Sequence, residues 1–246
     1  MDRLNLNIST SNKSRRVLTI CVPVLNEKEN ILPLYERLNL LSYTMESKCD
    51  FEFIFTDNDS TDGTWEILEA LGKSDKRVHA YRFATNVGFQ NSILFNISQA
   101  TGDAVVQIDA DLQDPPELIA GMIDKWEKGA EVVLAKRVDR SEDTIFKRKS
   151  AEFFYKVHNK LANINIPDNV GDFRLMDKMV VESINELRER QRFMKGIFAW
   201  VGFKTETIEY VRASRREGDS KFSGWKLWNL ALEGFTSFST IPLRLW

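Results

Sequence analysis

The residues best suited to chemistry are Asp109, Asp111 and Gln113, which alternate at the end of an apolar run that begins at Ala104. In an extended strand, residues i, i+2 and i+4 share one face, so these oxygen atoms can converge on one point. Oxygen ligands select Mg²⁺ or Mn²⁺, which bridge protein carboxylates to a diphosphate. The spacing predicts a divalent metal site, although such an acidic pair also occurs in solvated loops.

Two further polar clusters follow apolar runs. Asp57 directly follows one of them and could accept the N–H of a uracil or guanine ring, and Pro23, Leu25 and Glu27 could line the other side of the same nucleotide. Other residues of the polar clusters are interpreted as the starts of helices. Ser60, Thr61 or Asp62 would cap one helix, and Asp114, followed by Pro115, Pro116 and Glu117, would begin another.

The elements that must position these residues alternate along the chain. The expected strands are Val17–Pro23, Phe51–Thr56, Val78–Phe83, Ala104–Asp109 and Glu131–Lys136. The expected helices are Ile31–Leu41, Trp65–Leu71, Gln90–Gln99, Leu118–Trp126, Ala151–Leu161 and Lys178–Leu187. This order predicts an α/β fold with a mostly parallel sheet, whose functional residues gather where the strands end.

Composition indicates one ordinary globular domain. The chain has 246 residues, of which 43% are hydrophobic and 28% charged. Its two cysteines, Cys21 and Cys49, exclude a disulfide framework and a cysteine zinc site. The printed sequence contains neither a signal-peptide core nor a run of ~18 apolar residues.

The net charge of −2 conceals two unlike halves. Residues 1–135 carry 13 basic and 21 acidic side chains, whereas residues 136–246 carry 21 basic and 15 acidic ones. The second half is therefore expected to meet something anionic, such as a phosphate or a membrane surface.

Taken together, the segments VPVLNE, TDNDSTDGT, ATGDAVVQIDADLQDPPE and RREGDSKF resemble the family 2 inverting glycosyltransferases of GT-A fold. The likeness extends from Arg16 to Trp246. More narrowly, the chain resembles the polyprenyl-phosphate glycosyltransferases, which include dolichol-phosphate mannose synthase and the bactoprenol glucosyltransferases of O-antigen modification. The segments NVGDFRLM and SKFSGWKLWNLALEGF carry the likeness to the last group.

The resemblance implies roles at matching positions. The nucleoside would be held by Pro23, Leu25, Glu27 and Asp57. The metal, Mg²⁺ or Mn²⁺, would be held by Asp109, Asp111 and Gln113. The donor or acceptor phosphate would be contacted by Arg137, Arg148, Arg215, Ser220 and Lys221. The residues expected to act in catalysis are Asp111, Asp172, Arg148, Arg215 and Lys221.

Two positions depart from the family pattern. Asn58 stands where the family usually has a second Asp, which leaves the role of that position open. Phe89 stands where close relatives carry Lys or another polar residue, which affects how its loop meets the donor. Asp172 is left with three readings: a base, an acceptor-positioning carboxylate or a structural residue.

The expected reaction moves a hexose, glucose from UDP-glucose, onto undecaprenyl phosphate at the cytoplasmic face of the bacterial inner membrane. An amino sugar, a modified arabinose or GDP-mannose would suit the same groups. A lipid phosphate is already anionic, so it can attack without a general base. The expected partners are the UDP-sugar, the polyprenyl phosphate and the membrane surface, with no nucleic acid; a homo-oligomer is compatible with them.

The expected organisation is an N-terminal tail over residues 1–15, a catalytic domain over 16–222 and an amphipathic juxtamembrane segment over 223–246. The last segment could also be a core helix, but interleaved Trp and Lys suit a bilayer interface. Relatives with this ending continue into membrane-spanning helices, so such helices are expected beyond residue 246.

Three other functions predict sequence features that differ from those of a polyprenyl-phosphate glycosyltransferase. A processive polysaccharide synthase would need a QxxRW segment, and a dinucleotide-binding dehydrogenase would need GxGxxG after the first strand. The chain contains no QxxRW and reads PVLNEKEN after that strand. A noncatalytic membrane-binding or nucleic-acid-binding module would explain the basic half but would leave Asp109 and Asp111 without a role.

Overall fold

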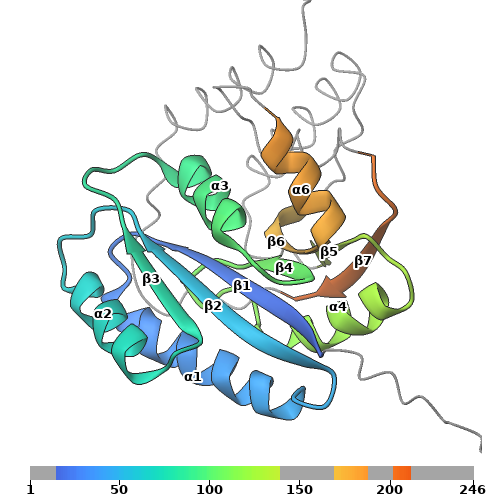
Figure 1. Ribbon diagram of the computed structural model, residues 1–246, viewed down its shortest axis with the longest axis horizontal. Helices are drawn as coiled ribbons and strands as arrows, with labels where there is room; N and C mark the ends of the chain where they lie inside the picture. The colour runs from blue at the N-terminus through green and yellow to red at the C-terminus, as the bar shows by residue number, and fades with distance from the viewer. Residues whose placement is uncertain (1–14, 139–168, 188–201, 212–246) are drawn as a thin grey trace, which may run out of the picture.

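The computed structural model describes residues 15–138, 169–187 and 202–211. Seven strands form one sheet (Figure 1) in the order β3-β2-β1-β4-β6-β5-β7. The strands are β1 (Arg16–Val24), β2 (Cys49–Asp57), β3 (Val78–Arg82), β4 (Ala104–Gln107), β5 (Val132–Arg137), β6 (Val170–Asp177) and β7 (Thr205–Tyr210). The helices of the described ranges are α1 (Lys28–Thr44), α2 (Thr64–Ser74), α3 (Phe89–Gln99), α4 (Leu118–Glu127) and α6 (Lys178–Glu186).

These elements confirm the predicted α/β class. All five expected strands form, and five of the six expected helices form with ends shifted by a few residues. The sixth, Ala151–Leu161, lies outside the described residues. The short apolar runs became strands because both faces of a parallel sheet are covered, which favours continuous Val, Ile and Phe.

Strand β1 aligns the edge at which the sequence places its polar clusters. It pairs in parallel with β2 on one side and β4 on the other, and Val24 lies opposite Asp57 in the first pair. Parallel strands end at a common edge, so the loops that follow β1, β2 and β4 are neighbours.

Strand β6 is the exception to the parallel order, because it runs antiparallel to both β4 and β5. The sequence did not predict it as a strand, since the charged residues Asp172 and Arg174 interrupt its apolar pattern. In the structure Arg174 is nonetheless only 3% exposed. A buried charge of this kind breaks the hydrophobic pattern on which strand prediction depends.

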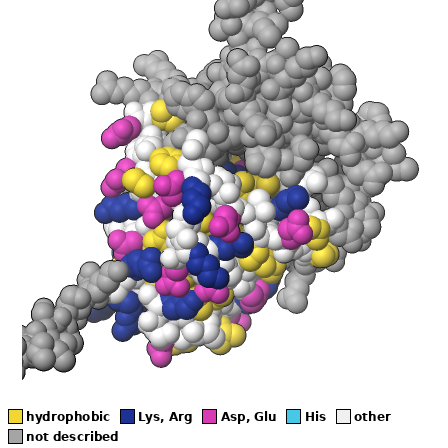
Figure 2. Space-filling view, turned by 90° about the vertical axis from the view of Figure 1, so that its right-hand side faces the viewer, with side chains coloured by type: hydrophobic (Ala, Val, Ile, Leu, Met, Phe, Trp, Pro, Cys, Tyr) yellow, Lys and Arg dark blue, Asp and Glu magenta, His cyan; other side chains and the backbone are white. Residues whose placement is uncertain are grey.

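Strand β7, also not predicted, forms one edge of the sheet. Its burial alternates, as expected for an edge strand with one covered face. Parallel pairing with β5 holds it in the sheet. Two surface ion pairs also contact it: Lys125 of α4 lies 2.9 Å from Glu206, and Lys136 of β5 lies 3.2 Å from Glu209. On the side of the molecule that lies to the right in Figure 1, Lys and Arg side chains are interspersed with Asp and Glu (Figure 2).

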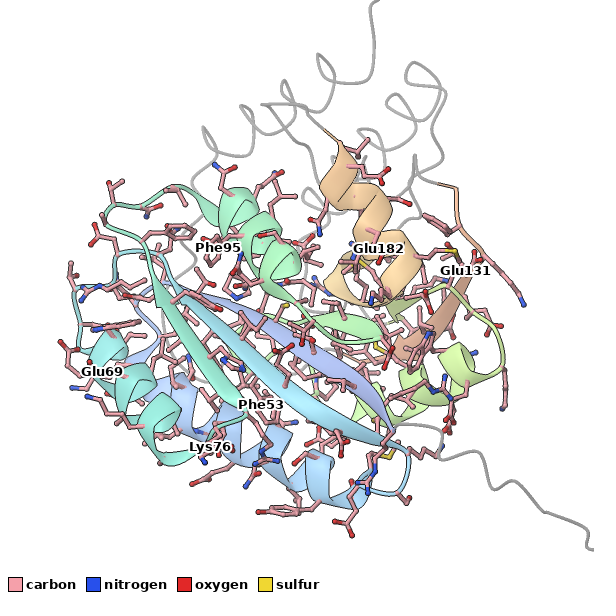
Figure 3. All side chains as sticks on the ribbon, in the orientation of Figure 1. Phe53, Glu69, Lys76, Phe95, Glu131 and Glu182 are labelled. Atoms are coloured by element: carbon pink, nitrogen blue, oxygen red, sulfur yellow. The ribbon has the colours of Figure 1, made fainter. Side chains whose placement is uncertain are left out.

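Apolar side chains fill both sides of the sheet. One cluster packs α1, α2 and α4 against it, and the other packs α3 and α6 against the opposite face (Figure 1). Figure 3 marks one aromatic residue in each layer, Phe53 under the sheet beside α1 and Phe95 on α3. Phe95 packs edge-on against Tyr81 at 5.2 Å and Phe83 at 5.1 Å between ring centroids. The two layers make the sheet a rigid platform for the loops at its edge.

Both cysteines are buried and neither forms a disulfide. No helix within the described ranges is both long enough and apolar enough to cross a membrane.

Candidate active site

Three hydrogen bonds connect the loops that follow β1 and β2. The Asn26 amide donates to Ser60 Oγ at 2.8 Å, and the Thr61 amide donates to Asn26 Oδ1 at 2.8 Å. The Asn58 amide donates to the Val24 carbonyl oxygen, also at 2.8 Å. These bonds hold Asn26 at a φ of +51°, a left-handed conformation that Asn tolerates better than most residues. The two loops therefore form one fixed wall of the site.

Asp57, predicted to hold the base, lies at the end of β2 with 0% exposure. Its carboxylate accepts the Ser60 amide at 3.2 Å and pairs with Arg82 Nε at 3.2 Å. The guanidinium also donates to the Ser60 carbonyl and lies 5.6 Å from the Trp65 ring centroid. A charge buried this deeply requires a partner. Arg82 supplies it and was not anticipated, because its link to Asp57 is their register in the β2–β3 pair.

The other three predicted nucleoside residues lie along β1 and the loop after it. Pro23 is buried within β1, and Leu25 and Glu27 are half-buried. Glu27 also begins α1: its carbonyl oxygen accepts the Asn30 amide at 2.9 Å, and its carboxylate accepts Asn30 Nδ2 at 2.7 Å. Glu27 thus has a structural task whether or not it contacts a nucleotide.

The predicted metal residues do not extend a strand, and the sequence-based reason for their convergence was wrong. Strand β4 ends at Gln107, and the chain turns through residues 108–114. Asp111 Oδ1 accepts the Gln113 amide at 3.1 Å, and Leu112 between them has a φ of +59°. The i, i+2 alternation of a strand therefore ends before Asp109. A turn closed by an Asp side chain sets their arrangement instead.

The chemistry of this set still fits a hard cation. Asp109 and Asp111 provide carboxylate oxygens and Gln113 an amide oxygen, which are the donor types of Mg²⁺ and Mn²⁺ sites. Asp111 is 8% exposed, so its charge lies in an environment that favours a cationic partner. Among the described residues, no group of three or more His, Cys, Asp and Glu side chains is placed to hold a metal. This set, with two carboxylates, would leave further positions to water and phosphate.

Asp114 does not cap α4 as predicted. The helix begins at Leu118 after Glu117, whose side chain makes no capping hydrogen bond. Asp114 is instead 1% exposed and accepts a hydrogen bond from the Tyr210 hydroxyl. Arg137 Nε donates to the same hydroxyl at 3.1 Å. The structure thereby joins a predicted phosphate ligand, Arg137, to the loop that carries the metal residues.

Asp172 lies near the same edge of the sheet. In the antiparallel β4–β6 pair Gln107 is opposite Arg174, and Asp109 and Asp172 each lie two residues further toward this edge. Buried Arg174 donates to the Gly171 carbonyl at 2.8 Å, and its Nη2 lies 3.9 Å from Asp172 Oδ1. Burial lowers the pKa of Arg174 to about 10, against the opposing effect of Asp172. Arg174 thus fixes the backbone that presents Asp172.

The two departures from the family pattern belong to one structural unit. Asn58 Oδ1 accepts the Val87 amide and Asn58 Nδ2 donates to Asn86 Oδ1, both at 2.9 Å. Asn86 Oδ1 also accepts the Gly88 amide at 2.9 Å. Phe89 follows at the start of α3 and is 39% exposed. Asn58 therefore fastens the loop that presents Phe89.

Four predicted phosphate or catalytic residues lie outside the described residues: Arg148, Arg215, Ser220 and Lys221. Residues 1–14 of the predicted tail and the whole predicted juxtamembrane segment, residues 223–246, also lie outside the described residues. The described edge carries the loops after β1 and β2, the oxygen-bearing side chains of Asp109, Asp111 and Gln113, and the half-buried guanidinium of Arg137. It can bind an anionic nucleotide and offset negative charge that develops on a leaving group.

Sequence comparison assigns the chain to a protein family. The model described as glycosyl transferase family 2 matches residues 19–184. The chain is 51% identical over 229 residues to the prophage bactoprenol glucosyl transferase homolog of Escherichia coli K12 and, to the same extent, to the bactoprenol glucosyl transferase of Shigella phage SfV. Each alignment covers 93% of this chain and 74% of the relative.

A solved structure supports the fold independently. Glucosyl-3-phosphoglycerate synthase from Mycobacterium tuberculosis, in complex with Mn²⁺, UDP-glucose and phosphoglyceric acid, superposes with a TM-score of 0.57 at 16% identity. The match covers 88% of this chain and 76% of that one.

Proposed function

Because the chain belongs to glycosyl transferase family 2, we propose that it transfers glucose from UDP-glucose to undecaprenyl (bactoprenol) phosphate, with inversion at the sugar. The observation that carries the choice of substrates is the 51% identity, over 93% of the chain, to bactoprenol glucosyl transferases. The described edge of the sheet supports the proposal, since the carboxylates of Asp109 and Asp111 suit a metal ion on a diphosphate and the Arg137 guanidinium suits the diphosphate itself.

The donor nucleoside binds against the wall formed by the loops after β1 and β2. Asp57, backed by Arg82, accepts the base N–H, and Pro23, Leu25 and Glu27 line the rest of the wall. The rigidity of these hydrogen-bonded loops supports this assignment because a preformed site loses little conformational entropy on binding.

The donor diphosphate lies next to the oxygen ligands. Asp109, Asp111 and Gln113 would hold Mg²⁺ or Mn²⁺, and the bound cation would offset negative charge on the leaving diphosphate. Arg137 adds a fixed positive charge on the same side. Arg148, Arg215, Ser220 and Lys221 are proposed from sequence to contact the donor or acceptor phosphate and to bring the two anions together.

The acceptor requires no general base, because its phosphate is ionised at neutral pH. We therefore assign Asp172 to substrate positioning and not to proton removal. Its carboxylate, near the ligand edge and backed by Arg174, would orient the sugar or the incoming phosphate in line with the leaving group. Positioning is the main requirement when the nucleophile is already charged.

A lipid acceptor would put the reaction at a membrane, and a UDP-glucose donor would put it on the cytoplasmic face of the bacterial inner membrane. Residues 16–222 would form the catalytic domain, and residues 223–246 would lie along the membrane surface. The glucosylated lipid would supply a cell-envelope glycan such as O-antigen.

A radiolabel transfer assay tests the proposal. The full chain is incubated with UDP-[¹⁴C]glucose, undecaprenyl phosphate in anionic phospholipid vesicles and Mn²⁺ or Mg²⁺. Label is expected in the lipid extract, and it should be absent when the acceptor is omitted or the metal is chelated. Parallel reactions with UDP-N-acetylglucosamine and GDP-mannose test the sugar. Faster transfer from either would overturn the assignment of glucose, and no lipid product from any donor would overturn the proposed function.

A further inference from the structure

A buried tyrosine connects Arg137 to the loop of the metal residues. Tyr210, at the end of β7, is 6% exposed. Its hydroxyl accepts from Arg137 Nε at 3.1 Å and donates to Asp114 Oδ1. Arg137 and Tyr210 are paired in register between parallel β5 and β7, so their side chains extend from one face. One hydroxyl thus uses both its donor and its acceptor capacity to join three elements.

Neighbouring residues pack closely around the Arg137 guanidinium and the Tyr210 ring. A Cβ built on Gly171, at the adjoining end of β6, would lie 3.0 Å from Arg137 Nη2. The Phe173 ring packs edge-on against the Tyr210 ring, with centroids 6.5 Å apart and planes at 81°. The backbone also holds Arg137, whose amide donates to the Asn169 carbonyl at 3.1 Å. The tyrosine ring is thus fixed by packing, and a Cβ at residue 171 would be close enough to Nη2 to push the guanidinium aside by a few tenths of an ångström.

The charges explain why this cation stays ionised. Burial acts to lower the pKa of Arg137, but the Tyr210 hydroxyl and the charges of Asp114 and Asp109 raise it more, and the net shift is upward. The geometric link to the predicted metal residues is the Tyr210 hydroxyl, which accepts from Arg137 Nε and donates to Asp114, next to Gln113 in the loop that carries those residues. A cation held there is ready to meet a diphosphate bound at those residues.

We propose that Tyr210 and Asp114 are positioning residues, which aim the Arg137 guanidinium at the donor diphosphate, and that residue 171 is glycine to leave the guanidinium its space. The ligand is the diphosphate of a nucleotide-sugar, so the inference rests on the proposed function. Neither Tyr210 nor Asp114 touches substrate. Their contribution passes entirely through Arg137.

A double-mutant cycle on UDP binding tests this dependence. Isothermal titration measures the Kd of UDP for the full chain in the presence of Mn²⁺. Arg137→Met removes the charge at similar volume and should weaken UDP binding about tenfold. Tyr210→Phe keeps the ring and removes the hydroxyl, and should weaken binding about fivefold. Gly171→Ala should have a similar effect by displacing the guanidinium. In the Arg137→Met background, neither second substitution should weaken binding further.

The chain offers a matched control for each substitution. Tyr35→Phe removes another tyrosine-to-aspartate hydrogen bond, to Asp75 Oδ2 at 2.7 Å, remote from the ligand edge. Gly72→Ala, in α2, places a Cβ at an ordinary 3.5 Å from its nearest neighbour. Both controls should leave the Kd of UDP unchanged. Thermal unfolding of every variant shows whether a loss of binding reflects a loss of fold.

Three results would overturn the inference. The first is a Kd of UDP that Arg137→Met leaves unchanged, and the second is a Kd that neither Tyr210→Phe nor Gly171→Ala changes as a single substitution. The third is an equal loss of UDP binding when either substitution is made in the wild-type chain and in the Arg137→Met variant. A wild-type chain that binds UDP and shows the coupled cycle but makes no glycolipid would overturn the proposed acceptor reaction and leave this inference standing. A wild-type chain that does not bind UDP would overturn both.

Discussion

The fully buried carboxylate of Asp57 pairs with Arg82 Nε at 3.2 Å, although the Arg82 side chain remains 37% exposed. The pair joins the ends of two neighbouring parallel strands at the proposed nucleoside site. The two side chains differ in solvent exposure, because only the aspartate is fully removed from water. Removing the arginine should therefore lower the free energy of unfolding by more than the loss of one exposed ion pair would.

Arg82→Ala should lower the free energy of unfolding by about 2 kcal/mol, since Asp57 would keep its charge without its cation. Adding Asp57→Asn should recover a large part of this loss. Urea denaturation measures both. The control is Arg37→Ala, which breaks an exposed pair with Glu117 and should cost less than about 1 kcal/mol. A double variant less stable than Arg82→Ala would contradict the argument.

Asp111→Asn removes the negative charge of this residue and keeps an oxygen that can accept its structural hydrogen bond. The asparagine oxygen can still accept the Gln113 amide, so the unfolding temperature should change little. Transfer should fall by about 100-fold or more, because one of two carboxylates proposed to hold the cation has lost its charge. Transfer rates and Mn²⁺ titration provide the two measurements. Asp124→Asn, on the surface of α4, serves as control. Full activity in Asp111→Asn would remove its proposed metal role.

Asn58→Asp restores the residue usual in the family and should loosen the loop before α3. Asn86 Oδ1 accepts from both Asn58 Nδ2 and the Gly88 amide, and an aspartate at residue 58 cannot donate. Losing a net bond of about 1 kcal/mol should speed hydrogen exchange at Gly88 about fivefold. Asn39→Asp is the matched control, because Asn39 Oδ1 only accepts from Arg77. Unchanged exchange in Asn58→Asp would mean that the loop is held by other contacts.

Asp75 should make stability depend on pH in the acid range. Hydrogen bonds from Arg77 lower the pKa of this carboxyl to about 2, against the opposing effect of burial. A lowered pKa stabilises the fold above the unfolded-state value of about 3.9 and ceases to do so as pH falls through about 2. Asp75→Asn should therefore cost about 1 kcal/mol above pH ~5, and the two proteins should converge near pH 2. Denaturation curves across this range check it, and a difference independent of pH would refute it.

The places where sequence reasoning succeeded and failed have physical causes. The strands before Asp57 and Asp109 were predictable because apolar runs of strand length are a local signal. The ends of those strands also placed most candidate residues on one edge. The geometry of Asp109, Asp111 and Gln113 was not predictable, because it depends on the positive φ of Leu112 and a side-chain bond to the backbone.

Contacts distant along the chain were outside the reach of pattern reasoning. Asp114 and Tyr210 are 96 residues apart, and the Asp114-Pro-Pro-Glu segment carries every local mark of a helix start. Strand β6 was missed because Arg174 is buried where the pattern requires an apolar residue. Arg82 could have been suspected only by assuming the register of β2 with β3.

The sequence by itself determined the order of the first five strands and of the helices around them, the residue types of the site and the family, because these follow from local periodicity and from motifs in a set order. The tertiary structure alone decided which charges meet. It paired Asp57 with Arg82, turned Asp114 toward Tyr210, and placed Arg137 beside Gly171. The reason is burial: a charge removed from water must find its partner in three dimensions, and sheet register and turn geometry, not sequence spacing, determine which partner is within reach.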